Sequence, residues 1–332
     1  MWIRPPNEPW QLQQENRQLA AINYENGFQN MILSVDFSDL KGQEAVWIFP
    51  VPATPDKTVI DVVKGFPQFS GYDIKRKTDS TISGAFNTMR LTQLYPLFLF
   101  PFYFYSGFGS TASDMKTGSI LGEHGGVTLY EHIEKMGLVT ELITAETGDA
   151  LYNYLMGKDL NLPASSKAVF DEYTGYEYSF VVSWINDIPK FKEEQVKTGY
   201  SSGNVIAVSL TFPTDKMYYP LKPTSIYGSQ SVPATIYVMG YVTPELYPAI
   251  KSSSTVNYFA QDYSYSPPVA LKSFFNDKTS FSDMRYTIIT LNPPSKYLTE
   301  DLWISQAAPL DVIAADFINK NVWGRGEYSK TC

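Results

Sequence analysis

Residues 17–37, "RQLAAINYENGFQNMILSVDF", decide the fold class that we predict for this chain. Two segments rich in apolar residues flank Asn26-Gly27, a dipeptide that tolerates the positive φ angles of a tight turn. This pattern predicts a β-hairpin. A third strand is expected at 45–49, and because short connections usually join spatial neighbours, it is expected in the same sheet as the hairpin.

The composition agrees with a sheet-rich protein. Hydrophobic residues make up 44% of the 332 residues, which is enough for one large core or two medium ones. Charged residues are only 18% and aromatic residues 15%, with 24 tyrosines, a mixture that suits half-buried sheet surfaces. We therefore expect an α+β, β-rich fold with mixed or antiparallel sheets and a few short helices.

Local signals along the chain predict further elements. Pro50, Pro52 and Pro55 are expected to end the third strand, since proline donates no ladder hydrogen bond. A short helix is expected at 58–65. Two strands within 125–146 are expected to meet near Gly137.

The second half of the chain carries clear helix signals. Thr147 suits an N-cap and Gly157 a C-terminus, which predicts a helix between them, and a second short helix is expected behind Ser165. The segments "YEYSFVVSWIN" and "NVIAVSLTFPTD" predict long strands joined by a charged connection, whereas the Tyr/Ser/Pro-rich residues 252–268 predict a loop. A terminal helix is expected at 308–319.

We divide the chain into an N-terminal β-rich part at 1–125, with an aromatic loop at 92–108, and a C-terminal α+β part at 126–332. One continuous domain is the alternative. No internal repeat is visible.

The charge and cysteine content exclude several classes of partner and cofactor. A formal net charge of −8 provides no positive field for phosphates, so nucleic acid is not an expected partner. Cys332 is the only cysteine, which excludes an internal disulfide framework and a cysteine-based metal cluster. No cofactor is expected, since "GFGSTA" at 107–112 lacks the preceding β-unit and the third glycine of a phosphate-binding loop.

Catalytic motifs are weak. "GYSSG" at 199–203 has the spacing of a nucleophile elbow, but a β-like segment follows it and both histidines precede it, whereas the α/β-hydrolase order needs a histidine downstream. We interpret it as a hairpin loop, and we expect no catalytic residues there. A pair of carboxylates for glycoside hydrolysis leaves no local spacing signature, so a carbohydrate-active hydrolase with an acidic, aromatic-lined cleft stays open as the alternative function.

The two histidines, His124 and His132, lie among Glu123, Glu131 and Glu134. A set of this kind can ligate zinc or iron, but its spacing does not place the ligands together on one helix. If 127–135 is a strand, His132 shares a face with Glu134, while Glu131 points the other way. We therefore expect no metal site.

The order of several motifs resembles an archaeal member of the domain of unknown function family 2330. The motifs are "WIFPVP" at Trp47 to Pro52, "ALYNYL" at Ala150 to Leu155 with Leu162-Pro163 behind it, and the strand pair from Leu210 to Leu221. The resemblance covers about residues 15–65 and 125–245. It implies an exported or surface-anchored protein without an assigned activity.

The run "TQLYPLFLFPFYFYSGF" at 92–108 is the feature that indicates contact with a membrane surface or a partner. Its twelve most apolar residues would reach only about 18 Å as a helix, against a hydrocarbon core of about 30 Å, so the run does not span a bilayer. Pro96 and Pro101 exclude a regular central strand or helix interior. Its flanks, "SGAFNTMR" and "SGFGSTASDMKTGS", predict flexible connections.

Three interpretations of this run stay open: packing in the core or between domains, contact with a protein partner, and contact with a membrane interface. Under the second and third, the predicted contact residues are Leu94, Tyr95, Leu97, Phe98, Leu99, Phe100, Phe102, Tyr103, Phe104 and Tyr105.

The function expected from the sequence is that of a non-enzymatic structural or binding component that touches a partner protein or a membrane surface through residues 94–105. We expect it outside the cytoplasm, at the cell surface or anchored to a membrane, with a leader and an anchor absent from this sequence. Oligomer formation is compatible with this expectation.

Overall fold

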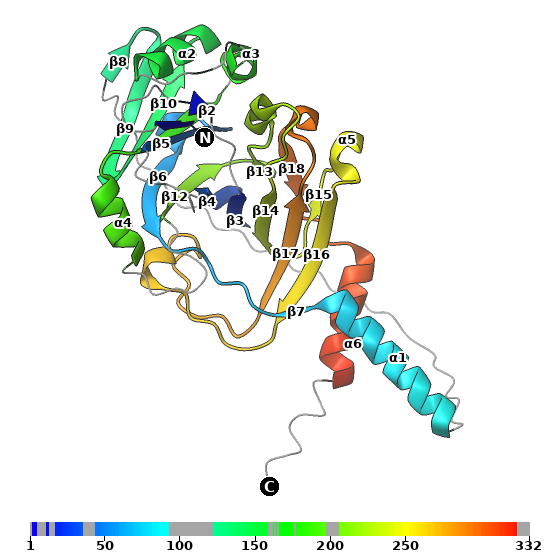
Figure 1. Cartoon of the computed structure of the whole chain (residues 1–332). Helices are drawn as coiled ribbons and strands as arrows, with labels where there is room; N and C mark the ends of the chain where they lie inside the picture. Colours follow the sequence, from blue (N-terminus) through cyan, green and yellow to red (C-terminus); the bar gives the residue numbers. More distant parts are fainter. Residues whose placement is uncertain are drawn as a thin grey trace.

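The computed structural model describes residues 2–4, 11–12, 17–35, 44–92, 122–158, 162, 164, 166–175, 177–196 and 206–323. Three β-sheets form the body of the protein, and helices lie on its outside (Figure 1). The fold class is the predicted one, a sheet-rich arrangement with mixed and antiparallel sheets and a few short helices.

The first large sheet, sheet A, is antiparallel and has the strand order β2-β1-β5-β11-β10-β9-β8. Its strands are β1 (Trp2–Arg4), β2 (Gln11–Leu12), β5 (Glu44–Val51), β8 (Gly122–His124), β9 (Val127–Lys135), β10 (Leu138–Ala145) and β11 (Ser179–Ile185).

The second large sheet, sheet B, has the order β6-β12-β4-β3-β14-β17-β16-β7. Its strands are β3 (Gln18–Glu25), β4 (Phe28–Val35), β6 (Val59–Lys64), β7 (Tyr72–Asp73), β12 (Ile206–Pro213), β14 (Ala234–Met239), β16 (Ser254–Gln261) and β17 (Met284–Leu291). Strands β3 and β14 pair in parallel, and the other neighbours are antiparallel. Each large sheet combines strands from before and after residue 125.

Sheet C is small and has the order β13-β18-β15. Its strands are β13 (Met217–Tyr219), β15 (Thr243–Pro244) and β18 (Leu302–Ser305). The described helices are α1 (Ile74–Thr92), α2 (Gly148–Gly157), α3 (Ser166–Asp171), α4 (Ile188–Val196), α5 (Pro248–Lys251) and α6 (Leu310–Trp323), with short 3₁₀ turns η1 (Pro55–Lys57), η2 (Lys222–Tyr227), η3 (Val269–Leu271) and η4 (Ser295–Tyr297).

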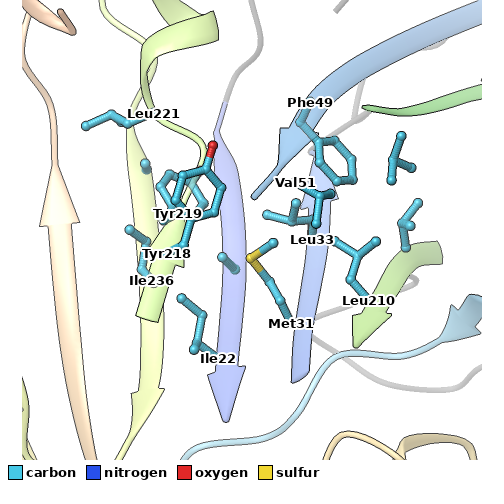
Figure 2. Packing of buried hydrophobic residues seen from close by; sticks show 14 of the residues in the cluster. Ile22, Met31, Leu33, Phe49, Val51, Leu210, Tyr218, Tyr219, Leu221 and Ile236 are labelled. Atoms are coloured by element: carbon cyan, nitrogen blue, oxygen red, sulfur yellow. The ribbon is translucent and has the colours of Figure 1, made fainter. Parts of the chain in front are cut away.

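The main core lies between sheets A and B and continues against sheet C. Phe49 and Val51 of β5 meet Ile22 of β3 and Met31 and Leu33 of β4 (Figure 2). Side chains alternate along each strand, so the residues between these positions face the opposite side of their sheet. The two large sheets are therefore packed face to face by a continuous apolar layer.

Helices α2 and α3 cover the outer face of sheet A. Leu151 and Leu155 of α2 and Phe170 of α3 pack with Phe180 and Val182 of β11. The outer face of sheet B is covered in part by the segment around η3. These coverings leave both large sheets buried on two sides over much of their area.

The predicted hairpin is confirmed. Asn26 and Gly27 have φ angles of 55° and 81°, and β3 and β4 pair directly on either side of them. The strand pair meeting near Gly137 is also confirmed, with Met136 and Gly137 at positive φ between β9 and β10. The Thr147 side chain accepts a hydrogen bond from the Ala150 N–H at 3.0 Å, as expected for the N-cap of α2.

The expected position of the third strand is wrong. Strand β5 lies in sheet A between β1 and β11, whereas the hairpin lies in sheet B. Strand β5 is buried on both faces of sheet A: Trp47 and Phe49 enter the main core, and Val46 packs under α2 and α3. Pro50 does not end the strand, since it pairs with Phe180 and β1 does not extend beside it.

Two other local predictions are wrong. Residues 59–64 form strand β6 instead of a helix, because Ile60 and Val62 enter the core while Val59 faces solvent, the alternation of a strand. Within the expected loop at 252–268, residues 254–261 form β16, which pairs along its whole length with β17. The two predicted long strands are β11 and β12, and the charged connection between them begins with α4, whose Phe191 is buried in the core.

The flank "SGAFNTMR", predicted as a flexible connection, lies inside the 19-residue helix α1. The local sequence pattern does not predict this helix because its mean composition is polar, with Ser, Thr and Asn near one glycine. The segment "GYSSG" at 199–203 and the aromatic run from position 93 onward lie outside the described residues.

Candidate functional site

Helices α1 and α6 cross at the edge of sheet B and project from the β body (Figure 1). Ile74 of α1 and Val312 and Ala315 of α6 are buried together with Tyr258 and Ala260 of β16. We call this pair of helices the α1–α6 arm. Its base is attached to the sheet by an apolar contact, and its outer part extends away from the body.

Polar contacts also fix the base of the arm. The Asn319 side chain donates hydrogen bonds to the Ile74 carbonyl and to the Thr78 hydroxyl, each at 3.0 Å. Lys75 of α1 and Asp311 of α6 form an exposed ion pair at 2.6 Å. These hydrogen bonds and the ion pair therefore add to the apolar contact between the two helices.

An ion network joins the arm to the edge of sheet B. The Arg285 guanidinium of β17 lies 2.9 Å from Asp316 of α6 and 2.9 Å from Asp262, and its side chain is only 15% exposed. Tyr72 donates a hydrogen bond to Asp262 at 2.5 Å. Burial opposes ionisation of Asp262, but the Tyr72 hydroxyl and the Arg285 guanidinium hold its pKa below the usual value.

The arm carries an apolar surface that no described residue covers. On α1, positions spaced by four change from buried to exposed: Ile74 is 0% exposed, Ile82 39% and Phe86 66%. On α6, Leu310, Ile313 and Phe317 share one face and are 76%, 48% and 66% exposed. Of the ten exposed large hydrophobic side chains in the described part of the chain, five lie on this arm.

The contact residues predicted from the sequence, Leu94 to Tyr105, lie outside the described residues. Helix α1 ends at Thr92, two positions before Leu94, so the chain enters that run directly from the arm. The apolar arm itself was missed. Its sequence signal is the spacing of Ile74, Ile82 and Phe86, and of the exposed apolar residues in α6, which form helical stripes.

His132 takes part in a cluster on the outer face of sheet A. His132 Nδ1 lies 3.1 Å from Glu141 Oε1, and its Nε2 lies 3.2 Å from Glu134 Oε1, so His132 and Glu134 share a face as predicted. His124 lies in β8. In the described parts of the chain, no group of three or more His, Cys, Asp and Glu residues is arranged to hold a metal ion.

Glu141 is the centre of this cluster and is buried. Tyr154 of α2 donates a hydrogen bond to it at 2.5 Å, and Lys158 Nζ lies 3.2 Å from it and 4.3 Å from the centre of the Trp184 ring. Burial raises the pKa of Tyr154 well above its usual value, so the phenol stays a hydrogen-bond donor. These contacts attach α2 to sheet A, so the cluster around Glu141 has a structural role.

A scan against family models finds no match for this chain, and searches of curated proteins and of solved structures find none. The resemblance to family 2330 therefore stays a prediction. Among the described helices, none is both long enough and apolar enough to cross a membrane.

Proposed function

We propose that this protein is a non-enzymatic binding component that works outside the cytoplasm and contacts a membrane surface through the α1–α6 arm and the adjoining residues 94–105. The observation that supports this proposal is the apolar surface of the arm, formed by Ile82, Phe86, Leu310, Ile313 and Phe317. The proposed location rests on the sequence resemblance described above.

The arm's apolar surface favours binding on energetic grounds. A Leu, Ile or Phe side chain gains roughly 1.5 to 3 kcal/mol when it moves fully from water into an apolar setting. The five side chains are between 39% and 76% exposed, so their remaining burial is worth several kcal/mol in total. Patches of this kind on a soluble body are typical of a protein or membrane contact.

The distribution of the exposed side chains favours a membrane over a protein partner. Exposure increases along α1 with distance from the body, from Ile74 to Phe86, and the chain then enters a run of twelve residues without a charge at 94–105. At a bilayer interface, the side chains can insert to different depths, and no partner pocket of matching shape is needed. Phe and Tyr also suit the headgroup region.

Vesicle flotation tests this proposal. The protein is expected to float with vesicles of zwitterionic phosphatidylcholine, and the triple variant Phe86→Ser, Ile313→Ser, Phe317→Ser is expected to remain in the dense fraction. Because these side chains are exposed, the free energy of unfolding of the variant is expected within about 0.5 kcal/mol of the parent value.

The matched control replaces three exposed apolar side chains on the body, Val59→Ser, Val269→Ser and Tyr263→Ser, which are 58%, 78% and 54% exposed. This control is expected to float like the parent. If the arm variant floats equally well, or if the parent stays unbound, the membrane proposal is wrong. Loss of a defined oligomer in the arm variant alone would instead identify a second copy of the chain as the partner.

The aromatic run is tested in the same assay by replacing Phe98, Phe100, Phe102 and Phe104 with serine. Under the proposal, flotation is lost while the melting temperature stays near the parent value. If the run is core, the four changes cost roughly 3 to 5 kcal/mol each and the protein melts early. Early melting with unchanged flotation would remove residues 94–105 from the contact.

A further inference from the structure

An open, shallow groove of about 530 Å³ lies where the three sheets meet, on a part of the surface that the proposed function does not use. Its apolar wall is formed by Pro52 after β5, Pro213 at the end of β12, and Trp303 in β18. The volume is in the range of small-ligand sites.

Trp303 is held as a fixed platform in this groove. It is half-buried, and its ring packs on Tyr218 with the ring centres 5.0 Å apart and the planes tilted by 56°. Tyr218 is fully buried and donates a hydrogen bond to Asp301 at 2.9 Å. Because the indole packs on the fully buried Tyr218, Trp303 is held in place as a lining residue of the groove.

Side chains that donate and accept hydrogen bonds lie around Trp303 in the groove. Lys216 Nζ lies 2.9 Å from Glu245 Oε1, and both side chains are about half exposed, at 55% and 47%. Asp215 is exposed beside them. The loop is fixed locally, since the Thr214 hydroxyl donates to the Lys216 carbonyl at 2.7 Å and the Thr214 carbonyl accepts from Tyr24 at 2.8 Å.

We propose that this groove binds a saccharide. The C–H groups on one face of a pyranose ring pack against the Trp303 indole, whose amphipathic ring is suited to such a contact. The hydroxyl groups of the sugar then donate to Asp215 and Glu245 and accept from Lys216. The groove supplies one apolar face and a rim of donors and acceptors, which is what a neutral polyol with one apolar face requires.

Other ligand classes fit the lining less well. One lysine beside two carboxylates leaves the rim without the positive charge that a phosphate group requires. A proline-rich peptide is recognised by several aromatic side chains in parallel, and Trp303 is the single aromatic residue among the described residues that line this groove. The saccharide is therefore the ligand class that the lining favours.

The groove is arranged for binding without hydrolysis. A glycosidase needs an acid held protonated in an apolar setting opposite a second carboxylate. Glu245 and Asp215 are both exposed to water, and Glu245 is paired with Lys216. Saccharide binding in this groove is thus distinct from the hydrolase alternative and independent of the α1–α6 arm.

Calorimetric titration of the full chain with maltotriose, cellotriose and chitotriose tests the proposal, with saturation-transfer NMR as a second readout. At least one of the three is expected to bind. Trp303→Leu is expected to weaken that binding by about tenfold or more, which corresponds to about 1.4 kcal/mol. The double variant Asp215→Asn, Glu245→Gln changes exposed side chains only, and it is expected to weaken binding without a change in melting temperature.

Two controls separate this site from the arm and from general surface effects. The arm variant Phe86→Ser, Ile313→Ser, Phe317→Ser is expected to bind the sugar like the parent. Glu134→Gln changes an exposed carboxylate outside the groove and is expected to be neutral. The proposal is overturned if none of the three sugars binds the parent protein, or if both groove variants bind as tightly as the parent.

Discussion

Asp301 is a carboxylate at which burial and hydrogen bonding act in opposite directions. Its Oδ2 accepts hydrogen bonds from Tyr173 and Tyr218, each at 2.9 Å, and its Oδ1 accepts from the Lys222 N–H at 2.9 Å. Burial outweighs these bonds and raises the pKa of Asp301 above its usual value of 3.8. The residue joins the turn after α3, sheet C and η2, and it contacts Tyr218, on which Trp303 packs.

This shift predicts a pH dependence of stability. The folded state holds the Asp301 proton more tightly than the unfolded state. The stabilisation that protonated Asp301 gives to the folded state is therefore fully present below pH 3.8 and is lost as the pH rises through the raised pKa. Asp301→Asn stays neutral throughout. The free energy of unfolding of the parent minus that of the variant is therefore expected to fall between pH 3.5 and 7, as measured by urea denaturation. A difference that grows with pH would show that the hydrogen bonds dominate.

Glu141 gives a second prediction at the scale of one residue. Glu141→Ala removes the acceptor of Tyr154 and the partner of Lys158, and it is expected to cost about 2 kcal/mol of unfolding free energy, less than for a fully buried pair because Lys158 is 31% exposed. Glu134→Ala is the matched control, since Glu134 also contacts His132 but is 62% exposed. It is expected to change stability by less than about 0.5 kcal/mol. Equal effects in denaturant titrations would refute the structural role of Glu141.

At the scale of single elements, two hairpin turns allow a matched test of what a glycine contributes. Gly27 and Gly137 have nearly the same φ, 81° and 79°, but a Cβ at Gly27 meets nothing within 4 Å, whereas one at Gly137 lies 2.5 Å from the Asp187 carbonyl and 2.7 Å from the Phe191 N. Gly27→Ala is expected to cost about 1 kcal/mol from backbone strain alone. Gly137→Ala is expected to cost about 3 kcal/mol, because α4 must also move. Thermal unfolding compares the two, and similar losses would show that the close approach of α4 contributes little.

The same elements show which local structures can be predicted from the sequence. Asn26-Gly27 and the Thr147 cap were predicted correctly, because their signals are complete within a few residues. Strand β6 was missed because Val59–Lys64 is short and apolar, a pattern shared by a buried helix segment. Helix α1 was missed because only its stripe from Ile74 to Phe86 is apolar, and its average composition resembles a loop.

At the scale of the whole molecule, the core predicts cooperative unfolding. The main apolar cluster contains Trp47 of sheet A, Ile22 of sheet B and Leu302 of sheet C, so the three sheets share one core. Denaturation curves from tryptophan fluorescence and from far-ultraviolet circular dichroism are therefore expected to coincide. Two separate transitions would show that the sheets unfold independently.

The arrangement in space was less predictable than the fold class. β5 was expected beside the hairpin, but it lies in the opposite sheet, since sequence proximity alone does not decide which of two facing sheets a strand joins. The saccharide groove gathers Pro52, Pro213, Glu245 and Trp303 from distant parts of the chain. No local spacing connects these residues, so the sequence carries no sign of their meeting.

The parallel pairing of β3 with β14 has a consequence for the synthesis of this protein. Strand β3 lies in the interior of sheet B, yet its partner Ala234 follows Gln18 by 216 positions (234 minus 18). At a ribosome speed of roughly 5 to 20 residues per second, the β3 edge of the nascent hairpin waits roughly 10 to 40 seconds for β14, and its β4 edge waits almost as long for β12. An unpaired edge in a crowded cell recruits other chains. A synthesis pause before residue 234 is therefore expected to increase aggregation, and a chaperone that shields the hairpin is expected to reduce it.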